Sequence, residues 1–151
     1  MILSVDTFRS EVARNCLDLG IDIINDISAG CIDKNILDVV AEYNCPYIMM
    51  HMKGTPQTMQ INPEYDNLIK ELLIFFAKRI YLAREKGIID IIVDPGFGFG
   101  KTLDHNYTIM KKIENFKLLD LPILVGISRK SFITKQLDID KKDSLNGTTA
   151  L

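Results

Sequence analysis

The chain has 151 residues, 47% of them hydrophobic and 25% charged, which is typical of a folded domain and excludes a disordered tail. Its net charge is -2, and acidic and basic residues are interspersed, so the sequence has no basic patch for binding nucleic acid or a membrane surface. No apolar run approaches the ~20 residues that cross a bilayer. The cysteines are widely spaced and no basic leader is present, so we expect a cytoplasmic protein that binds a small ligand.

Short apolar strands alternate with amphipathic helices in the first third of the chain. The pattern predicts strands at Ile2–Asp6, Ile21–Ile27 and Pro46–Met52, and helices at Arg9–Leu19 and Asp33–Tyr43. Strands this apolar, each followed by a helix, are typical of a parallel sheet that is covered on the outside.

The same alternation continues after a polar loop from Lys53 to Pro63. The later elements are three further helices, two strands and a final short helix: Glu64–Lys86, Ile88–Val93, Asp104–Phe116, Pro122–Ile127, Lys130–Leu137 and Ser144–Leu151. Either a doubly wound sheet or a barrel would fit this order of elements.

The positions of the polar residues favour the barrel. They follow a different strand each: Asp6, Asn25, the Met50-His51-Met52 group, Asp94 and the loop from Gly126 to Lys130. In a barrel all of these strand ends meet at one mouth, whereas a doubly wound sheet gathers its ligand at a single switch point. Because a full barrel takes ~250 residues, we predict a partial (β/α)8 TIM barrel of about five βα units.

Asp94 is the strongest candidate for a functional side chain. It directly follows the apolar strand Ile88–Val93 and begins a glycine-rich loop that runs to Lys101. A carboxylate at the end of a buried strand is costly unless a partner binds it, and the glycines let the backbone approach a ligand closely. A helix cap or an ion pair is the alternative role for this residue.

The other candidates also have structural alternatives. Asp6 would serve equally as a cap for the helix that follows it, and Asn25 with Asp26 would build an ordinary turn. His51 fits a structural histidine better than a catalyst, because no second histidine or carboxylate lies at ligand spacing. The segment Ser128 to Lys130 would equally be a solvated basic turn before a helix. The residue types alone leave these alternatives open.

Several motifs together resemble the dihydropteroate synthase family, the folate-pathway enzymes that sulfonamides target. The matching stretches are Ser4-Val5-Asp6-Thr7, Ile24-Asn25-Asp26-Ile27, Met50-His51-Met52-Lys53-Gly54, Asp94 to Lys101, and Gly126-Ile127-Ser128-Arg129-Lys130-Ser131. They occur in the family's order and at fitting separations, and the resemblance covers essentially the whole chain. The glycine-phenylalanine loop followed by Gly-x-Ser-Arg-Lys-Ser is its most specific part.

The resemblance implies a fold, an activity and a pterin site. The family is a (β/α)8 barrel, and the motifs correspond to its third to seventh strands. It joins p-aminobenzoate to 6-hydroxymethyl-7,8-dihydropterin diphosphate and releases diphosphate. By resemblance, Asp94 and Asn25 hold the pterin edge, Lys130 contacts its carbonyl side, and Met50 and Gly126 line the pocket.

The resemblance also implies catalytic roles and a second substrate site. Asp6 faces the pterin, where its carboxylate would stabilise positive charge on the methylene carbon, and it joins Asp94 and Lys130 as the predicted catalytic residues. Phe99, Lys130 and Ser131 belong to the p-aminobenzoate site. Ser131 starts a helix, whose free N–H groups and dipole would favour the benzoate carboxylate.

Some family features have no match in residues 1–151. The family binds Mg²⁺ through an asparagine near its first strand and anchors diphosphate through an Arg-x-His motif on its eighth strand. We therefore expect Mg²⁺ as the cofactor but no metal ligand in this chain, a single incomplete pterin-binding domain over residues 1–151, and no turnover by these residues alone.

Two other functions remain as alternatives, and a homodimer is the candidate assembly. A pterin-binding methyltransferase domain would share the pterin-facing Asp and Asn residues, although the stretch from Gly126 to Ser131 favours the synthase. A noncatalytic binding or assembly module that associates through its open sheet edges is the second alternative.

Overall fold

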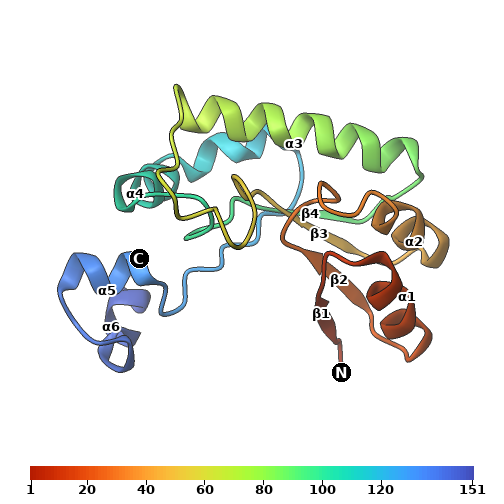
Figure 1. The fold of residues 1–151 in the computed structure, drawn as a ribbon, viewed down its shortest axis with the longest axis horizontal. Coiled ribbons are helices and arrows are strands. Elements are labelled where there is room, and N and C mark those ends of the chain that lie inside the picture. Colours follow the sequence, from red (N-terminus) through yellow and green to blue (C-terminus); the bar gives the residue numbers. More distant parts are fainter.

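A computed structural model describes residues 1–151, and a four-stranded parallel sheet lies at its centre (Figure 1). The strands are β1 (Ser4–Asp6), β2 (Ile23–Asp26), β3 (Tyr47–Met50) and β4 (Ile91–Asp94). They lie side by side in chain order, each paired in parallel with the next. This order is that of a βα barrel and not of a doubly wound sheet, so the predicted partial barrel is confirmed.

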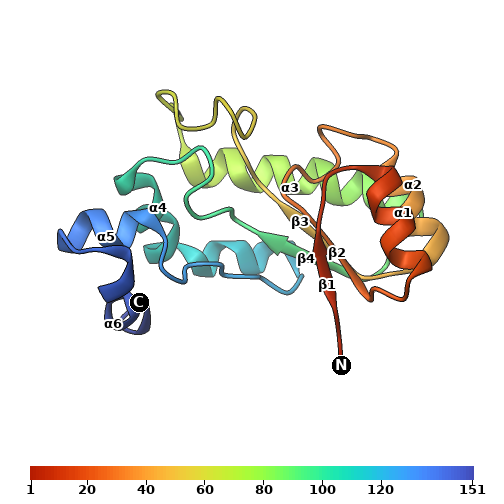
Figure 2. The same cartoon turned by 60° about the horizontal axis from the view of Figure 1, so that its bottom comes forward.

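Helices cover one face of the sheet (Figures 1 and 2). The first three are α1 (Ser10–Asp18), α2 (Ile36–Tyr43) and α3 (Leu68–Glu85). The long helix α3 starts later than predicted because Asn67 caps it, its side chain accepting the backbone N–H of Lys70 at 3.2 Å. No helix combines the length and the apolar composition that crossing a bilayer would require.

The two faces of the sheet differ because side chains alternate along each strand. Ile24, Tyr47 and Val93 point toward the helices and belong to one buried apolar cluster with Leu72 and Phe76 of α3. The intervening strand positions point to the opposite face. That face carries Asp6, Asn25 and Asp94 at the carboxyl ends of three strands.

The predicted fifth strand at Pro122–Ile127 is wrong in its extent. Only a bridge between Val93 and Ile123 forms. In it the Val93 N–H donates to the Pro122 carbonyl at 3.0 Å, and the Leu124 N–H donates to the Val93 carbonyl at 2.8 Å. The segment then leaves the sheet, and Val125 is 42% exposed. A short extended segment without a second neighbouring strand has few hydrogen bonds to define it.

The chain continues with α4 (Leu103–Lys111) and the 3-10 helix η1 (Ile113–Leu119), which lie beside α3 and add Ile109 and Phe116 to the core. The last elements, α5 (Ser131–Leu137), η2 (Lys141–Asp143) and α6 (Leu145–Thr149), stand away from the sheet (Figure 1). The single helix predicted for Asp104–Phe116 is therefore divided at Lys112. Phe132 of α5 packs on Phe97 and Tyr107, with ring centroids 6.0 and 5.6 Å apart, which anchors α5 beside α4.

Candidate active site

Four of the predicted site residues share one face of the sheet, at the carboxyl ends of its strands. Asp6 of β1 lies opposite Asn25 of β2, and Met50 of β3 lies opposite Asp94 of β4. The row of Asp6 and Asn25 continues into Ile48, two residues before Met50, so all four point the same way. The convergence that the sequence predicted is confirmed for these four residues.

Asp6 and Asn25 form a direct pair. The amide nitrogen of Asn25 donates to Oδ1 of Asp6 at 2.7 Å, while the amide oxygen of Asn25 is buried and has no hydrogen-bond partner. Helix α1 begins after Arg9 without a side-chain cap, so the alternative that Asp6 caps this helix is wrong. A buried acceptor without a partner is costly, and a ligand N–H would satisfy it.

The turn after β2 depends on Asp26 and not on Asn25. Asp26 lies on the helix-covered face, fully buried, where it accepts hydrogen bonds from the backbone of Ser28 and Gly30 at 2.7 and 2.6 Å. The Tyr47 hydroxyl donates to the same carboxylate at 2.7 Å. The structural alternative is therefore confirmed for Asp26, which leaves Asn25 free for a ligand.

Asp94 keeps one carboxylate oxygen without a protein partner. Its Oδ1 accepts the backbone N–H of Gly96 at 2.7 Å, and its Oδ2 faces Gly126, where an added methyl group would lie 3.9 Å away. Asp94 is only 7% exposed, and this burial raises its pKa against the opposing effects of the Gly96 N–H, Lys130 and Lys101. Thr102 caps the next helix, so Asp94 is no helix cap.

Gly96 is required by close packing of two loops. Its φ is +74°, and a side-chain carbon there would lie 2.1 Å from the carbonyl oxygen of His51. Gln60 and Tyr65 add hydrogen bonds from the loop after β3 to the carbonyls of Gly98 and Gly100, at 2.7 and 2.8 Å. The glycine-rich loop is thus fixed against the end of β3, with Asp94 at its base.

Lys130 reaches from the start of α5 back to this loop. Its ammonium lies 4.5 Å from the ring centroid of Phe99, and its aliphatic chain passes Gly98. Burial lowers the pKa of Lys130, and the carboxylate of Asp94 partly opposes that effect. Lys130, Phe99 and Asp94 therefore form one connected group.

Ser131 is exposed and faces a neighbouring cleft rather than Asp94. The cleft has a volume of about 270 Å³ and lies between the loop at Gln60, the glycine-rich loop at Gly98 and Lys101, and the first turn of α5. Helix α5 has seven residues, close to the predicted Lys130–Leu137, so few aligned peptide units contribute to its dipole. The hydroxyl of Ser131, not the helix dipole, is the feature available to an anion.

His51 has the structural surroundings that its sequence context favoured. It is buried, its ring meets Phe75 edge-on at 4.8 Å, and its Nδ1 lies 3.1 Å from the ammonium of Lys101. Burial and the Lys101 charge lower the pKa of His51 to about 3. Sequence reasoning missed Lys101, although its place at the end of the glycine motif was a signal.

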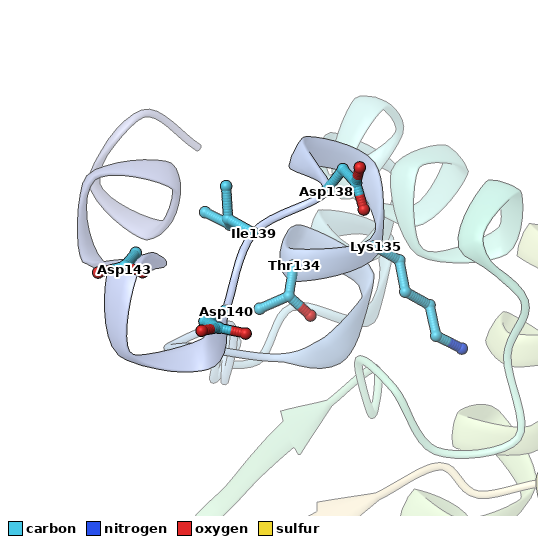
Figure 3. Close-up of a pocket in the computed structure, with 6 residues that line it drawn as sticks. All are labelled: Thr134, Lys135, Asp138, Ile139, Asp140 and Asp143. Atoms are coloured by element: carbon cyan, nitrogen blue, oxygen red, sulfur yellow. The ribbon is translucent and has the colours of Figure 1, made fainter.

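No group of three or more His, Cys, Asp or Glu side chains is placed to hold a metal ion. An acidic hollow of about 590 Å³ lies beside α5, and Figure 3 shows the side chains that line it. It contains none of the predicted site residues; its lining is Thr134, Lys135, Asp138, Ile139, Asp140 and Asp143. The carboxylates of this hollow are exposed to solvent.

Comparison with known proteins gives one consistent family. The model of the family described as pterin binding enzyme matches residues 1–151. Dihydropteroate synthase of Synechocystis sp. is 46% identical over 151 residues, which are 98% of this chain and 52% of that protein. The chain therefore spans about half the length of this curated relative.

Solved structures give the same result. A Yersinia pestis dihydropteroate synthase with a sulfonamide drug complex has a TM-score of 0.95 and 36% identity, covering 99% of this chain and 55% of that one. The Thermus thermophilus dihydropteroate synthase in complex with 6HMPPP has a TM-score of 0.94 and 32% identity, covering 99% of this chain and 60% of that one.

Proposed function

Because the chain belongs to the pterin-binding enzyme family, we propose that it is the central part of a dihydropteroate synthase. The reaction would join dihydropterin diphosphate to p-aminobenzoate in folate biosynthesis. The observation that carries this proposal is the pair of free acceptors at one edge of the sheet, Oδ2 of Asp94 and the amide oxygen of Asn25. Relatives named dihydropteroate synthase support the same activity.

Pterin recognition would use these two acceptors. The amino-pyrimidinone edge of a pterin presents adjacent N–H donors, which a carboxylate accepts pairwise in strong, charge-assisted hydrogen bonds. Asp94 is buried, and the Gly96 N–H holds its carboxyl group in place, so little rearrangement is needed on binding. Met50 and Gly126 would line the pocket, and Lys130 would donate to the carbonyl side.

The chemical step would be a substitution at the pterin methylene carbon. The amine nitrogen of p-aminobenzoate forms a bond to this carbon, the bond from the carbon to the diphosphate oxygen breaks, and the amine loses a proton. Positive charge develops on the methylene as diphosphate leaves. Asp6, oriented by its hydrogen bond from Asn25, would stabilise that charge electrostatically and would form no covalent bond.

The second substrate would lie between Phe99 and the start of α5. Phe99 offers an apolar wall, and Lys130 and Ser131 offer donors for the carboxylate. A sulfonyl group is also rich in acceptor oxygens, so a sulfonamide would compete for this place. Mg²⁺ would neutralise the diphosphate when bound, and we expect its protein ligand outside residues 1–151.

The assembly and cellular location that we propose are those expected from the sequence, a homodimer in the cytoplasm. Sedimentation of the purified protein would report the oligomeric state directly. The chain has no helix fit to cross a bilayer.

The test compares the chain with a completed barrel, defined as residues 1–151 joined to the flanking segments of the Synechocystis relative. Diphosphate release is measured with dihydropterin diphosphate, p-aminobenzoate and Mg²⁺ on samples whose folding is verified by circular dichroism. We expect turnover by the completed barrel and none by residues 1–151 alone. A folded completed barrel that binds pterin but makes no dihydropteroate would contradict the proposed function and favour the methyltransferase or binding alternatives.

A further inference from the structure

One buried charge near the site has no part in the proposed reaction. Lys101 is 4% exposed, and its ammonium nitrogen lies within hydrogen-bond distance of three acceptors. They are the carbonyl oxygen of Phe99 at 2.9 Å, Nδ1 of His51 at 3.1 Å and the carbonyl oxygen of His51 at 3.2 Å. A lysine this buried is rare unless its ammonium group is paired with other polar groups.

The hydrogen bonds of Lys101 couple its protonation to the tautomer of His51. A charged Lys101 has three N–H donors, one for each acceptor, and Nδ1 of His51 then accepts, with the imidazole proton on Nε2. A neutral Lys101 would donate to the two carbonyls and accept from a proton on Nδ1. Burial lowers the pKa of Lys101 to about 7, against the raising effect of Asp94, so the ammonium form prevails in mildly acidic solution.

These hydrogen bonds join two parts of the site. The Phe99 carbonyl belongs to the glycine-rich loop, and the His51 carbonyl belongs to the end of β3, one residue after Met50. Gly96 presses against the same His51 carbonyl. Lys101 thus holds the loop that carries Phe99 against the strand end that carries Met50.

The same ammonium acts on Asp94 through space. Lys101 and Lys130 both lower the pKa of Asp94, against the larger raising effect of burial. The charge of Lys101 also lowers the pKa values of His51 and His105. Among charged groups, Asp94 has the largest effect on the pKa of Lys101 itself, followed by Lys130.

We propose that Lys101 is a positioning residue of this site: its ammonium holds the loop that carries Phe99 against the strand end that carries Met50, beside Asp94, so that the contacts for both substrates are in place before they bind. The inference rests on the proposed function. It goes beyond a packing role because it predicts a change in pH dependence, which the loss of packing alone would not produce.

The experiment uses two replacements in the completed barrel. Lys101→Met removes the charge and all three hydrogen bonds while roughly keeping the length of the side chain. Lys101→Gln removes the charge but keeps two N–H donors. Lys53→Met is the matched control, because Lys53 is an exposed lysine of the adjacent loop that also donates to a backbone carbonyl, that of Glu64.

Pterin binding is measured by calorimetry from pH 4 to pH 8, and p-aminobenzoate kinetics at pH 6.5. Both Lys101 variants should move the acidic midpoint of pterin binding upward by about half a pH unit or more, because Asp94 loses a nearby cation. Lys101→Met should raise the Michaelis constant for p-aminobenzoate by about tenfold, the effect of losing a hydrogen bond to a charged group, and Lys101→Gln should raise it less. Lys53→Met should change neither.

An unchanged acidic midpoint in both Lys101 variants would overturn the inference. A wild-type completed barrel that binds pterin with the expected pH dependence but forms no product would instead refute the proposed reaction. Should Lys101→Met fail to fold, Lys101→Gln still tests the midpoint. Nitrogen-15 NMR of the wild-type protein at pH 6 tests the charge state without any variant: we expect a slowly exchanging Lys101 ammonium and a His51 proton on Nε2, and a His51 proton on Nδ1 would overturn the inference.

Discussion

Replacing Asp94 by asparagine should weaken pterin binding without weakening the fold. Asparagine has nearly the same shape, and its oxygen can still accept the Gly96 N–H that Asp94 accepts at 2.7 Å. Its amide nitrogen would then occupy the place of Oδ2, where a donor would face the pterin's own donors. The loss expected from removing one partner of a buried charged pair is ~2 to 5 kcal/mol, or about 30- to 4,000-fold in affinity.

The effect on stability should have the opposite sign. Burial raises the pKa of Asp94, so the folded protein binds this proton more tightly than the unfolded chain does. Its contribution to stability is full below the unfolded pKa of ~3.9 and is lost as the pH rises through the raised folded pKa. At pH 7 an ionised Asp94 therefore lowers the stability of the folded protein. The free energy of unfolding of Asp94→Asn should equal or exceed that of the unaltered barrel.

Calorimetric titration of a pterin and urea denaturation at pH 7, both in the completed barrel, measure the two effects. Asp90→Asn is the matched control, because Asp90 is an exposed carboxylate just before the same strand, at its opposite end. It should change neither quantity. Equal pterin affinities for the unaltered barrel and for Asp94→Asn would assign residue 94 to structure, and a clear loss of stability would refute the linkage argument.

Three further predictions concern the surrounding residues. Ser131→Ala should raise the Michaelis constant for p-aminobenzoate severalfold and weaken competitive sulfonamide inhibition, while pterin affinity stays the same. Lys130→Ala should instead weaken the binding of both substrates. An unchanged Michaelis constant of Ser131→Ala in steady-state kinetics would remove Ser131 from the site. Gly96→Ala should cost at least ~2 kcal/mol more in urea denaturation than Gly87→Ala, since both have positive φ but only Gly96 has a carbonyl oxygen 2.1 Å from the new carbon. Because the pKa of His51 falls from 6.5 to about 3 on folding, stability should decrease as the pH falls through this range, by up to ~1.4 kcal/mol per pH unit, and His51→Gln should flatten the measured dependence; parallel curves would contradict it.

The sequence predicted the sheet well because its buried strands are strongly apolar. Pro46–Met52 contains β3, and Ile88–Val93 overlaps β4, which begins at Ile91 and ends one residue later than predicted, at Asp94. Both strands are shorter than predicted, since a hydrogen-bond ladder stops where the neighbouring strand stops. Pro122–Ile127 has the same apolar character but forms only one bridge. Its composition is typical of a strand, but a strand forms only where an adjacent strand is present to pair with it.

The candidate site was predictable only in part. Asp94 was identifiable because a carboxylate after an apolar strand is unusual. Asn25 and Asp26 were not separable, because the alternation in a strand places one on each face without saying which. Lys101 was missed because a lysine after glycines normally lies in solvent, and its partner His51 is distant in the chain.

The adjacent residues Asn25 and Asp26 lie on opposite faces of β2, Asn25 on the ligand side and Asp26 on the helix-packed side. This arrangement limits how the segment can vary in evolution. Deleting or inserting one residue within β2 would exchange the two faces. The carboxylate that now accepts the Tyr47 hydroxyl and two loop amides would enter the ligand side, and the amide would enter the helix-packed core. A point replacement in β2 alters one of these side chains, whereas a length change displaces both at once, so the length of this strand should vary less than its sequence.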